Sequence, residues 1–151
     1  MKNFLKFIII LLPWFISAIL FKTDKTFYKN INKPFFAPSP IIFPIVWTIL
    51  YILLAISIYL IFKDNKISET KSYNKSLIIN YVSNQAFQFF FFTIKSPFLA
   101  LIDTIIVLIS SLYLYYESKK LNKNGSKLII PYIIWNGFAS ILIMFIFFMN
   151  L

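Results

Sequence analysis

Four side-chain amides are concentrated in one apolar stretch of the sequence, residues 77–94. Asn80, Asn84 and Gln88 follow one another at four-residue steps, so on a helix they share one face, with Gln85 beside them. An amide turned toward lipid would leave its donors and acceptors unpaired, at a cost of up to several kcal/mol. We therefore expect this stripe to face other helices, either as interhelical hydrogen bonds or as the polar wall of a ligand pocket.

Asp103 is the one acid well inside an apolar stretch. It follows Pro97 by six residues, which is ~9 Å along a helix at ~1.5 Å per residue, and this places it near a membrane interface. A structural role is expected first, in which the carboxylate accepts hydrogen bonds from loop backbone or from a tyrosine hydroxyl. A ligand contact or a proton relay is the alternative.

Several kinds of chemistry are excluded by composition. The chain has no histidine, no cysteine and no arginine, and its 15 positive charges are all lysines. Zinc, copper and haem iron therefore lack their usual protein ligands, so we expect no metal site and no required cofactor. We also find no acid–base dyad or activated nucleophile for conventional catalysis.

Five apolar segments must position these residues. Of the 151 residues, 60% are hydrophobic, which is more than a soluble domain of this size can bury. The runs are continuous, whereas strands of an outer-membrane barrel alternate polar and apolar residues. The sequence predicts an all-α polytopic membrane protein, a single five-helix domain over residues 1–151. The expected spans are 4–21, 41–62, 77–94, 97–117 and 128–149; a signal peptide is the alternative for the first.

The lysines predict the orientation of the spans. The N-terminal flank and the second and fourth loops carry ten lysines, and the first and third loops carry five. We therefore expect a cytoplasmic N-terminus, with the first loop and the C-terminus outside. The net charge of +10 arises from lysines beside apolar spans. Anionic lipid headgroups of the bilayer are better partners for them than nucleic acid.

Aromatic and amide residues from three spans reach the same depth, in the outer half of the bundle. A proline-rich first loop, with little backbone freedom, is expected to lie over them as a lid. Trp14, by contrast, is expected to be an interfacial anchor. The residues expected at this depth are Trp47 and Tyr51 in the second span, Asn84, Phe87 and Gln88 in the third, and Trp135, Ala139 and Leu142 in the fifth. The residues of the expected lid are Lys33, Pro34, Pro38 and Pro40.

Three motifs in order resemble the translocator protein/tryptophan-rich sensory protein (TspO/MBR, peripheral-type benzodiazepine receptor) family, in its bacterial form. They are "FYKNINKPFFAPSPIIFPIVWTILY", "NQAFQFFFFTIKSPFLALID" and "PYIIWNGFASIL". The resemblance implies a five-helix membrane bundle, often a homodimer, in a bacterial cytoplasmic membrane. It also implies a pocket that binds porphyrins, either protoporphyrin or haem. Sterol binding is not carried over, because the C-terminal Tyr-then-basic motif of the family is missing from "FIFFMNL".

The family resemblance assigns ligand-binding roles to many of the same residues. Those implied are Trp47, Tyr51, Asn84, Phe87, Leu99, Asp103, Trp135, Ala139 and Leu142; the amide stripe adds Gln88. Lys25, Lys29 or Lys33 could meet the porphyrin carboxylates.

The function expected from these residues is tetrapyrrole binding by a receptor, sensor or carrier. Light-driven porphyrin degradation, with Trp47 or Trp135 as donor, is an enzymatic variant. The alternatives are a small secondary transporter and a purely structural membrane protein.

Overall fold

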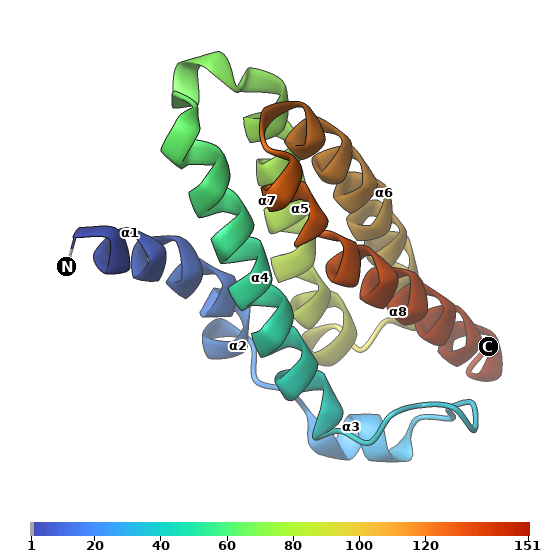
Figure 1. Cartoon of the computed structure of the whole chain (residues 1–151). Helices are drawn as coiled ribbons and strands as arrows, with labels where there is room; N and C mark the ends of the chain where they lie inside the picture. The colour runs from blue at the N-terminus through green and yellow to red at the C-terminus, as the bar shows by residue number, and fades with distance from the viewer. Residues whose placement is uncertain (1) are drawn as a thin grey trace.

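The computed structural model describes residues 2–151, with side chains from Asn3 onward. Among these residues it contains helices and connecting loops and no strand, which confirms the predicted fold class (Figure 1). The helical elements are α1 (Lys2–Leu11), the 3₁₀ turn η1 (Leu12–Phe15), α2 (Ile16–Leu20), α3 (Lys25–Asn30), α4 (Ile42–Asp64), the 3₁₀ turn η2 (Ile67–Glu69), α5 (Lys71–Gln88), the π-helical turn η3 (Phe89–Thr93), α6 (Pro97–Leu121), α7 (Lys123–Lys127) and α8 (Ile130–Met149).

Four helical segments of the described chain are long and apolar enough to cross a membrane. They are Asn3–Leu20, Ile42–Asp64, Pro97–Leu121 and Lys123–Met149. The remaining predicted span is also helical, as α5 and η3, but amides and an early start at Lys71 lower its hydropathy. The protein is therefore an integral membrane bundle whose third helix is its most polar.

The first span is a member of this bundle and is broken in the middle. Pro13 lies within η1, where a residue without a backbone N–H interrupts the helical ladder. α1 inclines strongly to α4 and projects from the side of the bundle (Figure 1). Trp14, in the break, is only 3% exposed and packs against Tyr51 and Tyr81. The expectation that Trp14 anchors at the interface is therefore wrong, because the 3₁₀ turn directs its ring inward.

Two groups of buried residues form the interior. One surrounds Leu54, Leu114 and Tyr132 on α4, α6 and α8, and the other surrounds Phe91 and Leu142 toward the opposite end. Burial of these apolar side chains against one another leaves the lipid-facing surfaces rich in exposed isoleucine and phenylalanine.

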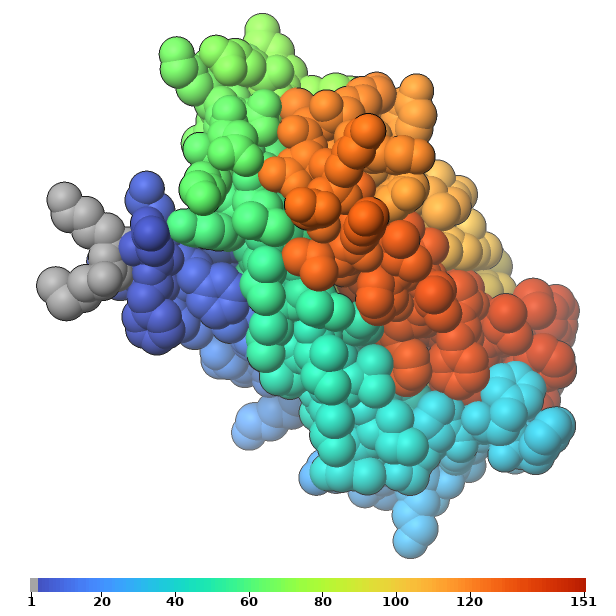
Figure 2. All heavy atoms as spheres, viewed as in Figure 1, coloured from blue at the N-terminus to red at the C-terminus, as the bar shows by residue number. Residues whose placement is uncertain are grey.

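The first loop lies across the end of the bundle where α4 begins and α8 ends (Figure 1). Figure 2 shows its surface against that of α8. Phe36 packs edge-on against Phe145, with ring centroids 5.3 Å apart. The Asn150 side-chain amide bonds the Asn32 backbone twice: its Oδ1 accepts from the Asn32 N–H at 3.1 Å, and its Nδ2 donates to the Asn32 carbonyl at 2.9 Å. The loop is therefore fastened to the last turn of α8.

Candidate functional site

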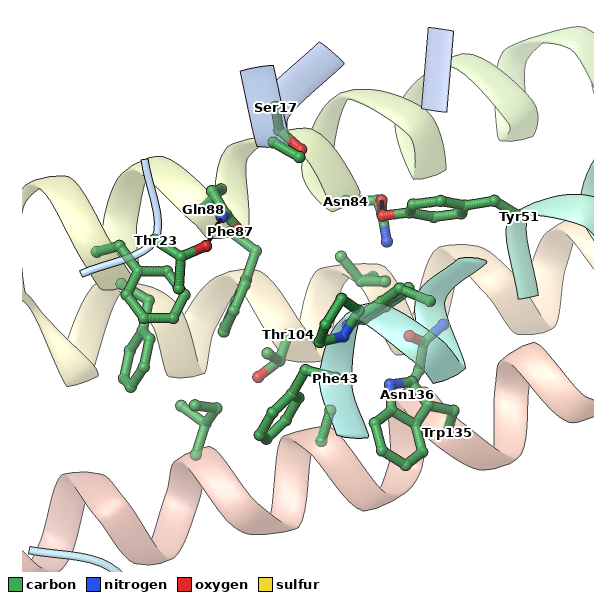
Figure 3. Close-up of a pocket in the computed structure, with 18 of the residues that line it drawn as sticks. Ser17, Thr23, Phe43, Tyr51, Asn84, Phe87, Gln88, Thr104, Trp135 and Asn136 are labelled. Carbon is green, nitrogen blue, oxygen red and sulfur yellow. Dashed lines mark hydrogen bonds between the residues drawn. The ribbon is translucent and has the colours of Figure 1, made fainter. Parts of the chain in front are cut away.

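A cavity of about 410 Å³ lies between the two groups of buried residues, beneath α3 and the end of the first loop. Its walls come from η1 and α2, α4, α5 and η3, α6, and α8 (Figure 3). This volume falls in the range of about 300–1,000 Å³ that is typical of small-molecule sites. The site therefore has the size and mostly apolar character of a binding pocket.

Most of the residues predicted to bind ligand line this one cavity. Leu99 and Asp103 do not line it. Leu99 occupies the first turn of α6, where its N–H donates to Ser96 Oγ at 3.3 Å. The predicted residues that line the cavity are Trp47, Tyr51, Asn84, Phe87, Gln88, Trp135, Ala139 and Leu142.

Asp103 is buried in α6, with 4% of its surface exposed. Its Oδ2 atom has no hydrogen-bond partner among the described residues. The contacts expected from loop backbone or a tyrosine hydroxyl therefore do not reach this oxygen. Asp103 shares a helix face with Val107, four residues on, whose carbonyl accepts a hydrogen bond from α5. Val107 itself lines the cavity, so the Asp103 carboxyl is buried one helical turn from the cavity wall.

A chain of buried hydrogen bonds closes the inner end of the cavity. The Tyr51 hydroxyl donates to Asn84 Oδ1 at 2.8 Å, and Asn84 Nδ2 donates to the Tyr132 hydroxyl at 3.2 Å. Tyr132 in turn donates to Asn80 Oδ1 at 2.9 Å. Asn80 Nδ2 donates to Ser110 Oγ on α6 at 2.9 Å. The predicted inward direction of Asn80 and Asn84 is thus observed, and these amides link α4, α5, α6 and α8.

The glutamines of α5 bind the broken first span instead. Gln85 accepts a hydrogen bond from the Ser17 N–H at 2.8 Å and donates to the Trp14 carbonyl at 3.2 Å. Gln88 Nε2 donates to Thr23 Oγ1 at 2.7 Å and, at 3.4 Å, to the Phe21 carbonyl. These side chains supply partners to backbone groups that η1 and the end of α2 leave outside a regular helix. Interhelical hydrogen bonding therefore accounts for Gln85, while Gln88 also lines the cavity.

Aromatic rings form most of the wall. The rings of Trp47 and Tyr51 on α4 are tilted at 34° with centroids 5.4 Å apart. Phe87 and Phe91 stack at 5.5 Å across the start of the π-helical turn. Trp135 on α8 meets Phe43 edge-on at 6.1 Å. Such faces suit a flat aromatic ligand, which can stack on them or contact their edges.

Hydrogen bonds and one ion pair fix the end of the cavity that lies beneath α3. The Tyr28 hydroxyl donates to the Pro38 carbonyl at 3.1 Å, and burial raises the pKa of the Tyr28 phenol above its ordinary 10.0. Lys95 Nζ lies 2.8 Å from Asp24 Oδ2. The hydrogen bond from Lys95 lowers the pKa of the Asp24 carboxyl below its ordinary 3.8, and a bond from the Phe27 N–H adds to this. α3 is thus held to the loop between η3 and α6.

Most of the residues predicted to form a lid do not reach the cavity. Pro40 lines it, whereas Lys33, Pro34 and Pro38 do not. Lys33 Nζ instead donates to the carbonyls of Tyr28, Ile31 and Lys29, at 2.6, 2.9 and 3.2 Å. The short helix α3, which was not predicted from the sequence, supplies two of these carbonyls, and Ile31 directly follows it. Lys25 and Tyr28 of α3 line the cavity.

Several lining residues were missed. Trp14, Phe43, Phe91 and Asn136 all line the cavity. Asn136 is 2% exposed, and its Nδ2 atom has no hydrogen-bond partner among the described residues. The spacing of Tyr132, Asn136 and Ser140 at four-residue steps could have identified this second polar face, as it did on α5. The described residues contain no group of three His, Cys, Asp or Glu side chains that could hold a metal ion.

Comparison with known proteins gives consistent matches over most of the chain. The family model for the TspO/MBR family matches residues 6–149. A "Tryptophan-rich protein TspO" of Bacillus cereus is 35% identical over 129 residues, which are 85% of this chain and 84% of the relative. An "Uncharacterized membrane protein YtaB" of Bacillus subtilis is 36% identical over 135 residues, 89% and 87% of the two chains. A "Translocator protein homolog" of Schizosaccharomyces pombe is 32% identical over 132 residues, 85% and 79% of the two chains.

Proposed function

The chain belongs to the TspO/MBR family, and from that premise we propose that it binds a porphyrin-type tetrapyrrole in the cavity between its helices. It would act there as a membrane receptor, sensor or carrier. The observation that supports this most is the convergence of tryptophans. All three tryptophans of the chain, from η1, α4 and α8, line the same cavity.

The wall chemistry suits a large flat π-system. A porphyrin would place its ring faces against Trp47, Phe87 and Trp135, which come from three different helices. The amides of Asn84 and Asn136 offer neutral polar contacts in an otherwise apolar wall. Because the chain has no histidine or cysteine, the usual side-chain ligands of haem iron are missing. Free-base protoporphyrin should therefore bind at least as well as haem.

Tryptophan fluorescence provides the test, because every indole of the chain lies at the site. Purified protein in detergent should show saturable quenching by protoporphyrin, and haem should bind no more tightly. Trp135→Ala should weaken protoporphyrin binding roughly tenfold, which corresponds to about 1.4 kcal/mol of lost stacking and apolar contact. Phe148→Ala on the same helix is the matched control, since Phe148 is 62% exposed on the lipid-facing surface.

Three results would contradict parts of this proposal. Absence of saturable binding would remove the tetrapyrrole and favour a purely structural protein. Equal affinities for wild type and Trp135→Ala would move the ligand away from this cavity. A marked preference for haem would show that the iron has a protein ligand, such as a tyrosine or methionine.

Porphyrin degradation is a variant of the same proposal, with Trp47 or Trp135 as the photochemical donor. The porphyrin complex would be illuminated in air and its absorbance followed. Bleaching faster than that of free porphyrin, and slowed in Trp47→Phe or Trp135→Phe, would support it. Bleaching at the rate of free porphyrin would exclude it.

A second candidate is proton-coupled transport of an amphipathic ligand. The buried Asp103 carboxyl, with Oδ2 unpartnered among the described residues, is the observation that favours it. Uptake into proteoliposomes would then depend on a proton gradient and be lost in Asp103→Asn. Binding retained without any gradient-driven uptake would reject transport in favour of a receptor or sensor.

A further inference from the structure

The charge at the cavity mouth, which is the end of the cavity beneath α3, is positive. Among the described residues that line the cavity, Lys25 on α3 is the only lysine, and none is an aspartate or glutamate. Lys25 is exposed, and none of the ion pairs found among the described residues includes it. An ammonium group is therefore available at the outer end of an otherwise uncharged wall.

The neighbouring lysines are occupied. Lys33 Nζ lies within 3.2 Å of three backbone carbonyls of α3 and the residue that follows it. Lys95 Nζ pairs with Asp24 at 2.8 Å and also lies 5.6 Å from the centre of the Phe27 ring. Asp24, the acid next to Lys25 in sequence, is thereby neutralised by another residue. Of the three lysines expected to meet an anionic ligand, Lys25 alone lines the cavity.

The inner end of the cavity cannot hold a charge equally well. Figure 3 shows Thr23 and Gln88 at one end and Tyr51 at the other. At the Tyr51 end, the Tyr51 hydroxyl already donates to the Asn84 amide, which in turn donates to the Tyr132 hydroxyl. No cation lines that end among the described residues. A carboxylate buried there would lose its hydration without gaining an opposite charge, which costs several kcal/mol.

We infer that the ligand carries a carboxylate at one edge and binds with this edge at the mouth, paired with Lys25, and with its aromatic body directed inward. This inference rests on the proposed function and adds the direction of binding and the preferred charge. The ammonium is a compact charge on a flexible stem, so it can follow a carboxylate without a fixed geometry. Lys25 is then the residue that favours acidic over neutral or cationic ligands of the same shape.

The test compares protoporphyrin, which has two carboxylates, with its neutral dimethyl ester. Both are titrated against wild type, Lys25→Gln and Lys25→Glu by tryptophan quenching at low ionic strength. Lys25→Gln should weaken protoporphyrin binding about two- to fivefold, the range of an exposed ion pair, and leave the ester unchanged. Lys25→Glu should weaken the binding of protoporphyrin further, because it places two negative charges together. High salt should reduce these differences.

Lys29→Gln is the matched control. Lys29 lies on the same short helix, is exposed and carries the same charge, but it does not line the cavity. It should leave the affinities for both porphyrins at their wild-type values. Thermal unfolding of the three variants checks that the first loop stays folded.

The outcomes separate this inference from the proposal beneath it. If Lys25→Gln weakens the binding of protoporphyrin and of its ester equally, or changes the binding of neither, the carboxylate does not pair with Lys25. The inference is then wrong, while porphyrin binding stands. If Lys29→Gln has the same effect as Lys25→Gln, the effect is a general one of surface charge, and the inference is again wrong. If wild type binds neither porphyrin, both the inference and the proposed function fail.

Discussion

Asn84 has two functions at the scale of single residues. Its amide joins Tyr51 on α4 to Tyr132 on α8, and the same side chain lines the cavity. A hydrogen-bonded amide in an apolar wall is fixed in direction, since rotation would leave a buried group unpaired. The hydrogen bonds that hold the helices together therefore also determine how the site presents its polar atoms.

Replacement of Asn84 should show this coupling. Asn84→Leu keeps a similar volume but leaves the buried Tyr51 hydroxyl without its acceptor, so the free energy of unfolding should fall by about 1–3 kcal/mol. Tyr51→Phe should cost about 1 kcal/mol, because it removes the hydroxyl and keeps the ring. Thermal or denaturant unfolding in detergent measures both.

The double variant is the control for Asn84→Leu. In the double variant, the hydroxyl that Asn84→Leu would leave unpaired is absent. The losses of unfolding free energy in the two single variants should therefore sum to more than the loss in the double variant. Strict additivity would show that the two residues do not interact in the folded membrane protein.

At the scale of elements, the break in the first span is matched by side chains on α5. Tyr81, Gln85 and Gln88 lie on one face of α5, and all three bond to the segment between Pro13 and Thr23. Tyr81 donates to the Pro13 carbonyl at 2.9 Å. α2 is therefore held against α5 by hydrogen bonds, where two regular helices would rely on close packing.

Gln85→Leu should weaken this attachment. It removes the partners of the Ser17 N–H and the Trp14 carbonyl together, so we expect a loss of about 1–3 kcal/mol in unfolding free energy. Val82→Leu, on the same helix at a position 58% exposed toward lipid, should change stability little. If the two variants unfold alike, the glutamine does not support the break.

An ion pair joins Asp24, at the start of α3, to Lys95 in the loop between η3 and α6. It should make the stability of the folded protein depend on pH. Lys95 holds the pKa of Asp24 below its unfolded value, so the ion pair stabilises the folded protein above pH 3.8. This stabilisation is lost as the pH falls through the lower pKa of the folded state. Asp24→Asn keeps an N-cap acceptor for the Phe27 N–H and removes only the charge. The difference in unfolding temperature between wild type and Asp24→Asn should therefore be present at neutral pH and vanish in acid.

Lys95→Asn is the reciprocal variant. Lys95 has a positive φ of 59°, and asparagine is one of the few residues that adopt this backbone conformation readily. The variant thus removes the ammonium without adding strain. It should abolish the same pH-dependent difference, and if it does not, the lowered pKa of Asp24 has another cause.

For the molecule as a whole, the helical bundle could be predicted from the sequence. Long apolar segments in a membrane must form helices, and amides among them must face other helices to be hydrogen-bonded. The sequence placed Trp47, Asn84 and Trp135 at one depth, and they do line one cavity. The prediction failed where the position of a side chain depends on the folding of a neighbouring segment. The inward turn of Trp14 follows from the 3₁₀ break at Pro13, and the engagement of Lys33 follows from carbonyls of α3 that only the folded loop brings together.

The orientation of the molecule in the membrane stays a prediction from its lysines, and the two ends of the bundle make it testable. The loops after α4 and α6 lie at one end, and α3 and the C-terminal end of α8 lie at the other (Figure 1). The wild-type chain has no cysteine, so single-cysteine variants carry one reactive thiol each. Lys29→Cys reports on the first loop, and Lys66→Cys reports on the loop after α4, where the Lys66 side chain is 82% exposed.

A membrane-impermeant maleimide applied to intact cells should label Lys29→Cys, and it should label Lys66→Cys only after the membrane is permeabilised. Ser57→Cys, fully buried in α4, should stay unlabelled in both conditions and serves as the control for folding. The physical reason for the expected pattern is the positive-inside rule, by which we expect the side with ten lysines to be the cytoplasmic one. The reverse pattern would place Lys25 and the cavity mouth on the cytoplasmic side, so that the ligand would be taken from inside the cell.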